Sequence, residues 1–469
     1  MNTKLKSFFK ENSIFFIILI SVSFLFIFYK IVQFQRFDLR EDFTLFENVL
    51  WNSCNGRFLI ENSYGNSYFS QHFTPIIILL MPIYCFFQSP YTLLVIDGLA
   101  ISMALIPLYI ISKHYTANKF LQFTVLISFI FYDRLFYGLS SNFYMEVFYP
   151  LFIFLLIYFM IKEKWLLYWI FFILVITIKE DSNIVLFGIG LYLLLKRNYK
   201  IGLISALIPL IVFPVTILYI IPGFPHPYGK HDIAFLERWS NYGNDVKSII
   251  LSMFNPIKDF NEIFSREKIK SVIGVLRQFI FIPLLNYKTI LLILPYLFFI
   301  LSSNYGTMYR FEYHYTLILI PILYLAFFEN LKWLKTYKFK YTENVISVLL
   351  IFTSIYSVNN IYNNIPRDMK KLNFGNKFDN ALNMISQIPG DESVSVSKTL
   401  ISRVPVRLHR THIPYGLDIA NYVIIYKDEK TSSFDEKITP LILDSLRNCT
   451  SWKIIKDEGE FVFFRKISP

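Results

Sequence analysis

The stretch Ile14–Asp42, IFFIILISVSFLFIFYKIVQFQRFDLRED, decides the class of fold. Its apolar part, Ile14–Val32, is long enough to cross a bilayer core of about 30 Å at about 1.5 Å per residue. The run is rich in aromatic residues and has no small-residue cleavage signal, so we interpret it as a signal anchor. The cluster Phe37-Asp38-Leu39-Arg40-Glu41-Asp42 follows it. Charged side chains this close together belong at the membrane surface.

The composition extends this interpretation to the whole chain. Of its 469 residues 54% are hydrophobic and 17% charged, which is typical of a membrane protein. The net charge of +12 does not indicate nucleic acid, because many Lys and Arg residues lie in short loops between apolar runs. The three cysteines have no metal-site spacing. We expect Cys85 to be buried, and a Cys54–Cys449 disulfide has little support.

Apolar segments predict about eleven transmembrane helices. With Lys4, Lys6 and Lys10 in the cytoplasm, most short-loop lysines also fall inside, and the C-terminus lies on the outer side. We therefore expect a multi-pass protein of the plasma membrane. The segments are 14–32, 91–112, 119–137, 143–161, 165–178, 183–195, 201–221, 272–285, 289–303, 314–329 and 343–358.

Two apolar regions are interrupted. Residues 165–195 break at Lys179-Glu180-Asp181, which predicts a short hairpin whose charged tip sits in a recessed, aqueous cavity. Residues 75–88 lie between prolines and are too short to span comfortably, so we expect an interfacial or re-entrant helix there. Asp97 lies within a span, and we expect it to pair with a neighbouring helix.

The chain divides into an all-α polytopic membrane domain, residues 1–359, and a small extracytoplasmic α/β domain, residues 360–469. The membrane domain has external loops at 33–90 and 222–271, and the second opens with the proline-rich turn Pro222–Gly229. The tail carries strand-like runs and helical stretches in alternation. The strands are expected at 393–397, 422–426 and 461–465, and the helices at 378–388 and 441–448.

Three residues are candidates for catalysis. Asp38 could act as a base toward an acceptor hydroxyl or as a metal ligand, or could belong to a solvated run of charge. His72, in Gln71-His72-Phe73-Thr74-Pro75, could shuttle a proton or bind phosphate, or could be structural. Glu146 lies at the outer start of a span, where it faces a cavity or forms a structural ion pair.

Basic residues at the outer ends of spans could bind the phosphate of a donor. Lys179 could do so as a point charge, supported by Glu180, Asp181 and Asp42. Arg310 and His314 open another span from outside, where they suit an anionic head group or form part of an interfacial belt. No P-loop, Rossmann glycine pattern, nucleophile elbow or zinc spacing occurs in the sequence.

The order of several short motifs resembles the membrane family known as domain of unknown function 2079. The resemblance covers nearly the whole chain. It is carried by Phe37-Asp38-Leu39 with Trp51-Asn52 and Gly56-Arg57, by His72-Phe73-Thr74-Pro75, by Lys179-Glu180-Asp181, by Ser302–Tyr315 and by Ile388-Pro389.

That family is similar to the GT-C superfamily of integral-membrane glycosyltransferases. The resemblance implies a polyprenyl-phosphate-linked sugar donor and a catalytic acidic residue in the first external loop, here Asp38. The chain departs from the family pattern Asp-Phe-His-Pro-Glu, because it has Asn142-Phe143-Tyr144-Met145-Glu146. A divalent metal, Mg or Mn, is a cofactor that the sequence leaves open.

We therefore expect a membrane glycosyltransferase that transfers a sugar from a polyprenyl-phosphate carrier to an extracytoplasmic acceptor. The alternatives are a transporter or flippase of a lipid-linked or anionic substrate, and a non-catalytic assembly factor. The sequence contains neither inverted repeats nor matched, broken spans of the kind found in transporters.

Overall fold

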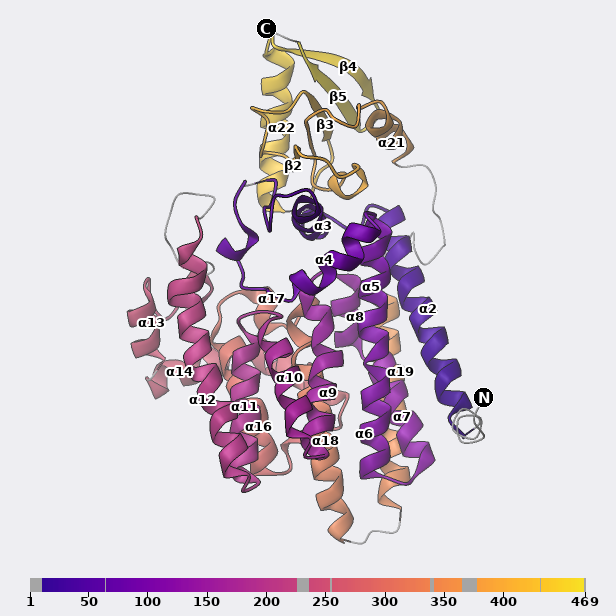
Figure 1. Ribbon diagram of the computed structural model, residues 1–469, viewed down its shortest axis with the longest axis vertical. Helices are drawn as coiled ribbons and strands as arrows, with labels where there is room; N and C mark the ends of the chain where they lie inside the picture. The colour runs from indigo at the N-terminus through magenta and orange to yellow at the C-terminus, as the bar shows by residue number, and fades with distance from the viewer. Residues whose placement is uncertain are drawn as a thin grey trace.

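The computed structural model describes residues 11–63, 65–225, 236–253, 255–337, 341–364, 378–430 and 432–467. Figure 1 shows long helices standing side by side, with a small sheet above one end of them. The bundle contains α2 (Ser13–Gln35), α5 (Pro90–Met103), α6 (Leu105–Tyr115), α7 (Lys119–Ile130), α8 (Asp133–Ser140), α9 (Tyr149–Ile161), α10 (Trp165–Ile176), α11 (Ser182–Leu195), α12 (Tyr199–Val215), α16 (Tyr287–Ser302), α18 (Leu319–Leu334) and α19 (Thr342–Asn364).

The outer faces of these helices expose apolar side chains, such as Ile17, Ile20 and Phe24 on α2. An exposed apolar surface of this kind is suited to lipid. Within the described ranges, four helical segments are long and apolar enough to cross a membrane, or up to six if each bent pair is one span. Other apolar helices of the bundle are shorter, and they include α10, α11 and α16.

All eleven expected segments contain helix, but the prediction of a continuous span at 272–285 is wrong. That region holds the end of α15 (Arg266–Arg277), followed by the 3₁₀ turn η6 (Ile282–Leu284). Ile280 and Phe281 have φ of 54° and 57°, values that end a right-handed helix. The apolar run therefore belongs to one face of an amphipathic helix and to a turn, and does not form a continuous span.

A buried ion pair joins α2 to α5. Lys30 Nζ lies 2.8 Å from Asp97 Oδ2, and the two side chains are 0% and 1% exposed. Lys30 also donates to the carbonyl oxygens of Leu139 (3.0 Å) and Ser141 (2.8 Å), just after α8. The expected pairing of Asp97 with a neighbouring helix is confirmed.

The first loop contains α3 (Glu41–Cys54), η1 (Tyr68–Ser70) and α4 (Ile77–Phe86), which is the helix expected at 75–88. A disulfide joins Cys54 to Cys85, whereas Cys449 is free and exposed. The expected burial of Cys85 is therefore wrong, and the Cys54–Cys449 bond, which had little support in the sequence, does not form. Packing of α3 against α4 brings the two cysteines together, and this contact is not visible in their sequence spacing.

The second loop contains η5 (Leu236–Trp239), α13 (Val246–Ser252), α14 (Pro256–Ile263) and α15. It follows the π-helical turn η3 (Thr216–Ile220) and the 3₁₀ turn η4 (Ile221–Gly223), which extend α12. The predicted turn at 222–229 lies partly outside the described residues, from His226 onward.

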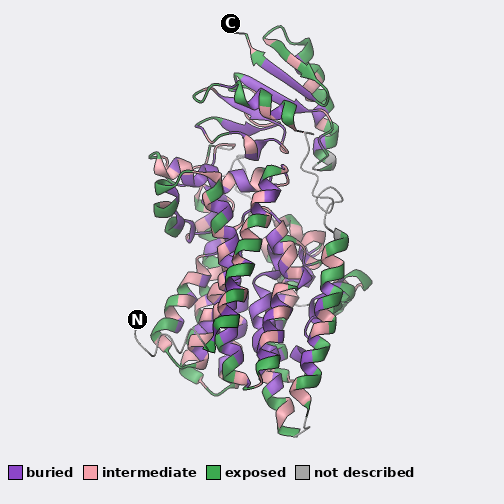
Figure 2. Ribbon diagram, turned by 90° about the vertical axis from the view of Figure 1, so that its right-hand side faces the viewer, coloured by how far each residue is buried: buried purple, intermediate pink, exposed green. Residues whose placement is uncertain are grey.

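The tail folds around a mixed sheet with strand order β2-β1-β3-β5-β4. Strand β1 is parallel to β2 and β3, and β5 is antiparallel to β3 and β4. The sheet is largely buried (Figure 2). The three expected strands and both helices are present, but β2 and β4 were missed. The elements are β1 (Val394–Val396), β2 (Arg410–His412), β3 (Tyr422–Tyr426), β4 (Trp452–Glu458), β5 (Phe461–Lys466), α21 (Asp379–Ser386) and α22 (Ser433–Asn448).

A buried arginine connects the tail sheet to the first loop through an ion pair and hydrogen bonds. Arg410 Nη1 lies 2.7 Å from Glu47 Oε2, and both side chains are almost fully buried. Arg410 also donates to Asn48 Oδ1 and to the carbonyl oxygen of Val404. The Phe37 ring stacks on Phe378, with centroids 4.4 Å apart. The acidic cluster is therefore held between the membrane helices and the tail.

Candidate functional site

A cavity of about 610 Å³ lies between the bundle and the first loop, and we call it the polar cavity. Its wall combines the acidic cluster with residues from the first loop, from the segment before α9, from the α10–α11 break and from the segment before α18. It brings together five residues singled out in the sequence: Asp38, His72, Glu146, Lys179 and His314. Asp42 also lines it.

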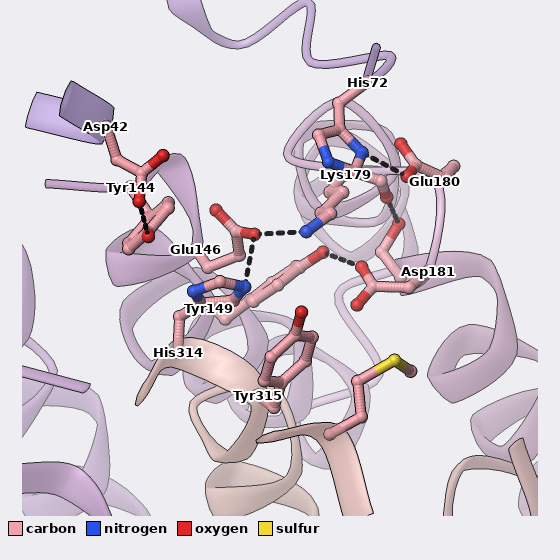
Figure 3. A network of polar contacts seen from close by, with 12 residues as sticks. Asp42, His72, Tyr144, Glu146, Tyr149, Lys179, Glu180, Asp181, His314 and Tyr315 are labelled. Carbon is pink, nitrogen blue, oxygen red and sulfur yellow. Dashed lines mark hydrogen bonds and ion pairs between the residues drawn. The ribbon is translucent and has the colours of Figure 1, made fainter. Parts of the chain in front are cut away.

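Glu146 is the centre of the charged network in this cavity (Figure 3). Lys179 Nζ donates to Glu146 Oε1 at 2.7 Å, and His314 Nε2 lies 3.4 Å from the same oxygen. The chain leaves its helical path between α10 and α11, and this break places Lys179 inside the bundle, opposite the η2 turn (Met145–Phe148). The ammonium of Lys179 is thus balanced by one carboxylate.

The other two residues of the interrupted hairpin point elsewhere. Glu180 Oε1 lies 2.7 Å from Nδ1 of His72, and its other oxygen accepts the backbone N–H of Phe73. Burial lowers the pKa of His72, and the nearby Glu180 carboxylate opposes that shift. A neutral His72 then donates from Nδ1 to Glu180 and turns Nε2 away from it. Asp181 accepts a hydrogen bond from the Tyr149 hydroxyl at 2.7 Å.

The three carboxylates of the acidic cluster have different surroundings. The Asp38 side chain is 34% exposed and lies 3.2 Å from Nε of Arg36. Burial raises the pKa of Glu41, Asp42 adds to the shift, and Lys398 of the tail opposes it from 3.7 Å. The Asp38 and Glu41 side chains are therefore about equally exposed, at 34% and 31%, and they differ in their partners, Arg36 and Lys398.

Asp42 is held by residues in the segment where the chain departs from its family pattern. The Tyr144 hydroxyl donates a short hydrogen bond to Asp42, and Asn142 Nδ2 donates to the same oxygen at 3.2 Å. Asn142 and Tyr144 thus use their polar groups to fix a carboxylate of the first loop. Asp42 has a supporting place in the site.

Arg310 lies apart from the Lys179–Glu146 network. Its side chain is 52% exposed and faces Glu267 and Glu312, each at 4.0 Å. It lines a second cavity of about 700 Å³ that adjoins the polar cavity, with Asp38 lining both.

Arg238 is the basic residue of the polar cavity that the sequence did not single out. Its guanidinium donates to the Tyr315 hydroxyl at 3.3 Å and lies 4.9 Å from the centre of the Tyr305 ring. It belongs to η5 in the second loop, in a stretch without a motif. Its only sequence signal was a basic side chain in an external loop.

An apolar cavity of about 230 Å³ adjoins the polar one. His72, Lys179, Arg238 and Tyr315 line both, so they mark the boundary. Glu180 and Asp181 border the apolar side. The rest of its wall is apolar, with Phe213, Ile217, Leu236, Trp239, Val246, Ile249, Met253, Phe299 and Met308.

The carboxylates of the site do not form a ready set of metal ligands. Across the described ranges, no three His, Cys, Asp or Glu side chains converge as a metal site would require. Asp42 is engaged by Tyr144 and Asn142, and Glu146 by Lys179. The described residues therefore do not fit a preformed Mg or Mn site.

The fold is similar to that of ArnT from Cupriavidus metallidurans, solved with undecaprenyl phosphate bound. The similarity covers 97% of this chain and 98% of that protein, with a TM-score of 0.52 and 9% sequence identity. No curated protein matches the sequence. The family of predicted membrane proteins DUF2079 matches residues 38–462. Its match spans the first loop, the helices of the bundle and the tail sheet, and the chain therefore belongs to the DUF2079 family.

Proposed function

We propose that the protein is an integral-membrane glycosyltransferase that takes a sugar from a polyprenyl-phosphate carrier and transfers it to an acceptor on the outer side of the membrane. Membership of a membrane family and the ArnT-like, GT-C type of fold support this class. ArnT was solved with undecaprenyl phosphate bound, and a lipid of that chemistry is the donor carrier that we propose here.

The observation that carries the proposal is that the polar cavity and the apolar cavity share four wall residues, His72, Lys179, Arg238 and Tyr315. A polyprenyl-phosphate sugar has the same two parts, a charged phosphate with its sugar and a long apolar chain. The apolar cavity shares Phe213, Ile217 and Val246 with a further apolar groove of about 320 Å³. Leu210 and Leu218 of that groove are exposed on the outer face of the bundle. An isoprenoid chain could therefore leave the site sideways into lipid.

Lys179 and Arg238 stand where the phosphate of such a donor would lie, at the boundary between the two cavities. An ammonium and a guanidinium both bind phosphate oxygens through charge-assisted hydrogen bonds, and both of these side chains line the wall that the two cavities share. His314, with Nε2 3.4 Å from Glu146 Oε1, is the third basic residue that we assign to the donor phosphate. We assign Asp38 the part of base, because it is the carboxylate of the cluster that lines both this cavity and the adjoining one.

The disulfide supports the proposed orientation. Disulfides persist in oxidising compartments outside the cytoplasm, so Cys54–Cys85 favours an external first loop. Arg410 fastens the tail to that same loop, and both parts must then lie on one side of the membrane. We therefore propose a cytoplasmic N-terminus and an extracytoplasmic tail in the plasma membrane, with residues 1–359 and 360–469 as the two domains.

The test is transfer of labelled sugar from a panel of polyprenyl-phosphate sugars in membranes that contain the full chain. Asp38→Asn should lower transfer by about two to four orders of magnitude, the range expected for loss of a general base. Asp391→Asn makes the same change at an exposed turn of the tail and should leave transfer unchanged. The proposal fails if the wild-type chain transfers no sugar but moves the lipid-linked donor across the bilayer, because that result identifies a flippase.

A further inference from the structure

The second cavity, of about 700 Å³, has an unusual balance of charge. Four cationic side chains line it, Arg40, Arg134, Lys270 and Arg310, against two carboxylates, Asp38 and Glu312. We call it the basic cavity. The polar cavity has the opposite balance, with Arg40, Lys179 and Arg238 against Asp38, Glu41, Asp42 and Glu146.

The cations of the basic cavity are only partly neutralised. Arg310 meets Glu267 and Glu312 at 4.0 Å, the outer limit of an ion pair. In the described part of the chain, no carboxylate lies within ion-pair distance of Arg40 or Lys270. The cavity therefore keeps net positive charge that faces solvent.

Arg134 is built into this wall. Its Nη1 donates to the carbonyl oxygen of Arg310 at 3.0 Å, which ties α8 to the segment before α18. Its Nε is buried without a hydrogen-bond partner among the described residues. The nearest carboxylate, Asp133 at 4.0 Å, is held at 3.1 Å by Arg277. Arg134 thus retains donor capacity.

We propose that the basic cavity binds the acceptor and that this acceptor carries a phosphate group. The inference rests on the proposed function, because it assigns the second substrate of the same reaction. Guanidinium groups bind phosphate oxygens through paired, charge-assisted hydrogen bonds. Asp38 lines both cavities and stands where the two substrates would meet.

Groups in the two cavities can accept the proton and the leaving group of this transfer. An acceptor hydroxyl gives its proton to Asp38 while its oxygen forms a bond to the anomeric carbon of the donor sugar. The bond from that carbon to the phosphate oxygen breaks, and polyprenyl phosphate leaves with the electron pair. Arg238 and Lys179 neutralise the leaving phosphate, whereas the basic cavity holds the acceptor phosphate away from it.

The acceptor phosphate could belong to a soluble glycan or to a lipid head group, and a binding experiment separates these sources. The full chain is placed in phosphatidylcholine nanodiscs and titrated with inorganic pyrophosphate, with heat stability as the readout. A second set of nanodiscs contains phosphatidylglycerol and receives no soluble anion. Stabilisation in the first set indicates a soluble phosphate, and stabilisation only in the second indicates a lipid phosphate.

The decisive variant is Lys270→Gln with Arg310→Gln, because both side chains are exposed and their loss should not disturb folding. It should weaken anion binding by about tenfold or more, as expected for loss of charged hydrogen bonds. The control pair Lys453→Gln with Arg465→Gln removes the same charges from exposed positions on the tail sheet and should change binding less than about twofold.

The outcomes distinguish this inference from the proposed function. Equal anion binding by wild type and by the Lys270–Arg310 variant overturns the acceptor assignment, even if sugar transfer is intact. Selective loss of anion binding supports the assignment. If the Lys270–Arg310 variant selectively loses anion binding but the wild-type protein transfers no sugar, the glycosyltransferase proposal fails and the assignment of an anion-binding site is kept.

Discussion

Replacing Arg410 by Met should loosen the tail from the first loop. The Arg410 and Glu47 side chains are 0% and 2% exposed, so the substitution leaves a buried carboxylate without its partner. Removal of one partner from a buried ion pair costs about 3–5 kcal/mol. Asn48 and the Val404 carbonyl oxygen also lose a donor. We expect a loss of stability in this range, confined to the tail and α3.

A double variant separates charge from packing. Glu47→Met added to Arg410→Met removes the orphaned carboxylate, so the double variant should be more stable than Arg410→Met alone. Arg447→Met is the matched control, because Arg447 pairs with Asp457 at 2.7 Å in an exposed position, 40% and 36% accessible. It should cost less than about 1 kcal/mol.

Hydrogen exchange of the intact protein provides the measurement. Peptides from β1, β3 and α3 should exchange faster in Arg410→Met and recover part of their protection in the double variant. The reasoning is refuted if Arg410→Met and Arg447→Met behave alike, or if the double variant is less protected than the single one.

Three further predictions concern the first loop and the tail. Because burial raises the pKa of Glu41 above its ordinary 4.5, the folded protein disfavours the ionised form of this side chain. Glu41→Gln should therefore raise the Tm at pH 7, and this gain should disappear below about pH 4.5, where the carboxyl is protonated in both the folded and the unfolded state. A gain in Tm of equal size at all pH values contradicts the assignment. Cys449 is free and exposed, and a membrane-impermeant maleimide should label it in intact cells but not label Cys449→Ser; labelling only after lysis would place the tail in the cytoplasm. Cys85→Ser should destabilise the first loop by about 2–4 kcal/mol in urea unfolding and free the Cys54 thiol for labelling, whereas an unchanged midpoint would show that packing of α3 on α4 is sufficient.

The sequence predicted most helices because a lipid-facing helix has to be apolar over its whole length, and hydropathy records this directly. The break at Lys179–Asp181 was also predictable, since three ionisable residues cannot continue an apolar span unpaired. The same method failed at 272–285, where the apolar residues of an amphipathic helix and a following turn have the average hydropathy of a span. Strand β2 was missed because Arg410 and His412, buried by partners from other segments, do not resemble strand residues.

The candidate site was predictable only in part. Asp38, His72, Glu146, Lys179 and His314 stood out because charged or polar groups beside apolar spans need a cavity or a partner, and they line one cavity. Their pairing was not predictable: Lys179 binds Glu146 and not its sequence neighbours Glu180 and Asp181. Arg238 gave no signal beyond a basic side chain in an external loop, because its position depends on how the second loop folds back over the bundle.

The Lys30–Asp97 pair has a consequence for the biogenesis of the protein. A lone charge at the centre of a helix costs about 2.5–3.5 kcal/mol during insertion by the translocon, and a charge nearer the helix end, such as Lys30 in α2, costs less. Lys30 finds its carboxylate only when α5 has been synthesised, and its two carbonyl acceptors only after α8. Helix α2 therefore enters the membrane with the Lys30 charge unpaired. That charge gains its carboxylate and its carbonyl acceptors only when the later helices have been inserted. Asp97→Leu should accordingly reduce the yield of inserted protein and should also destabilise the molecules that do insert, because it leaves Lys30 buried without its carboxylate.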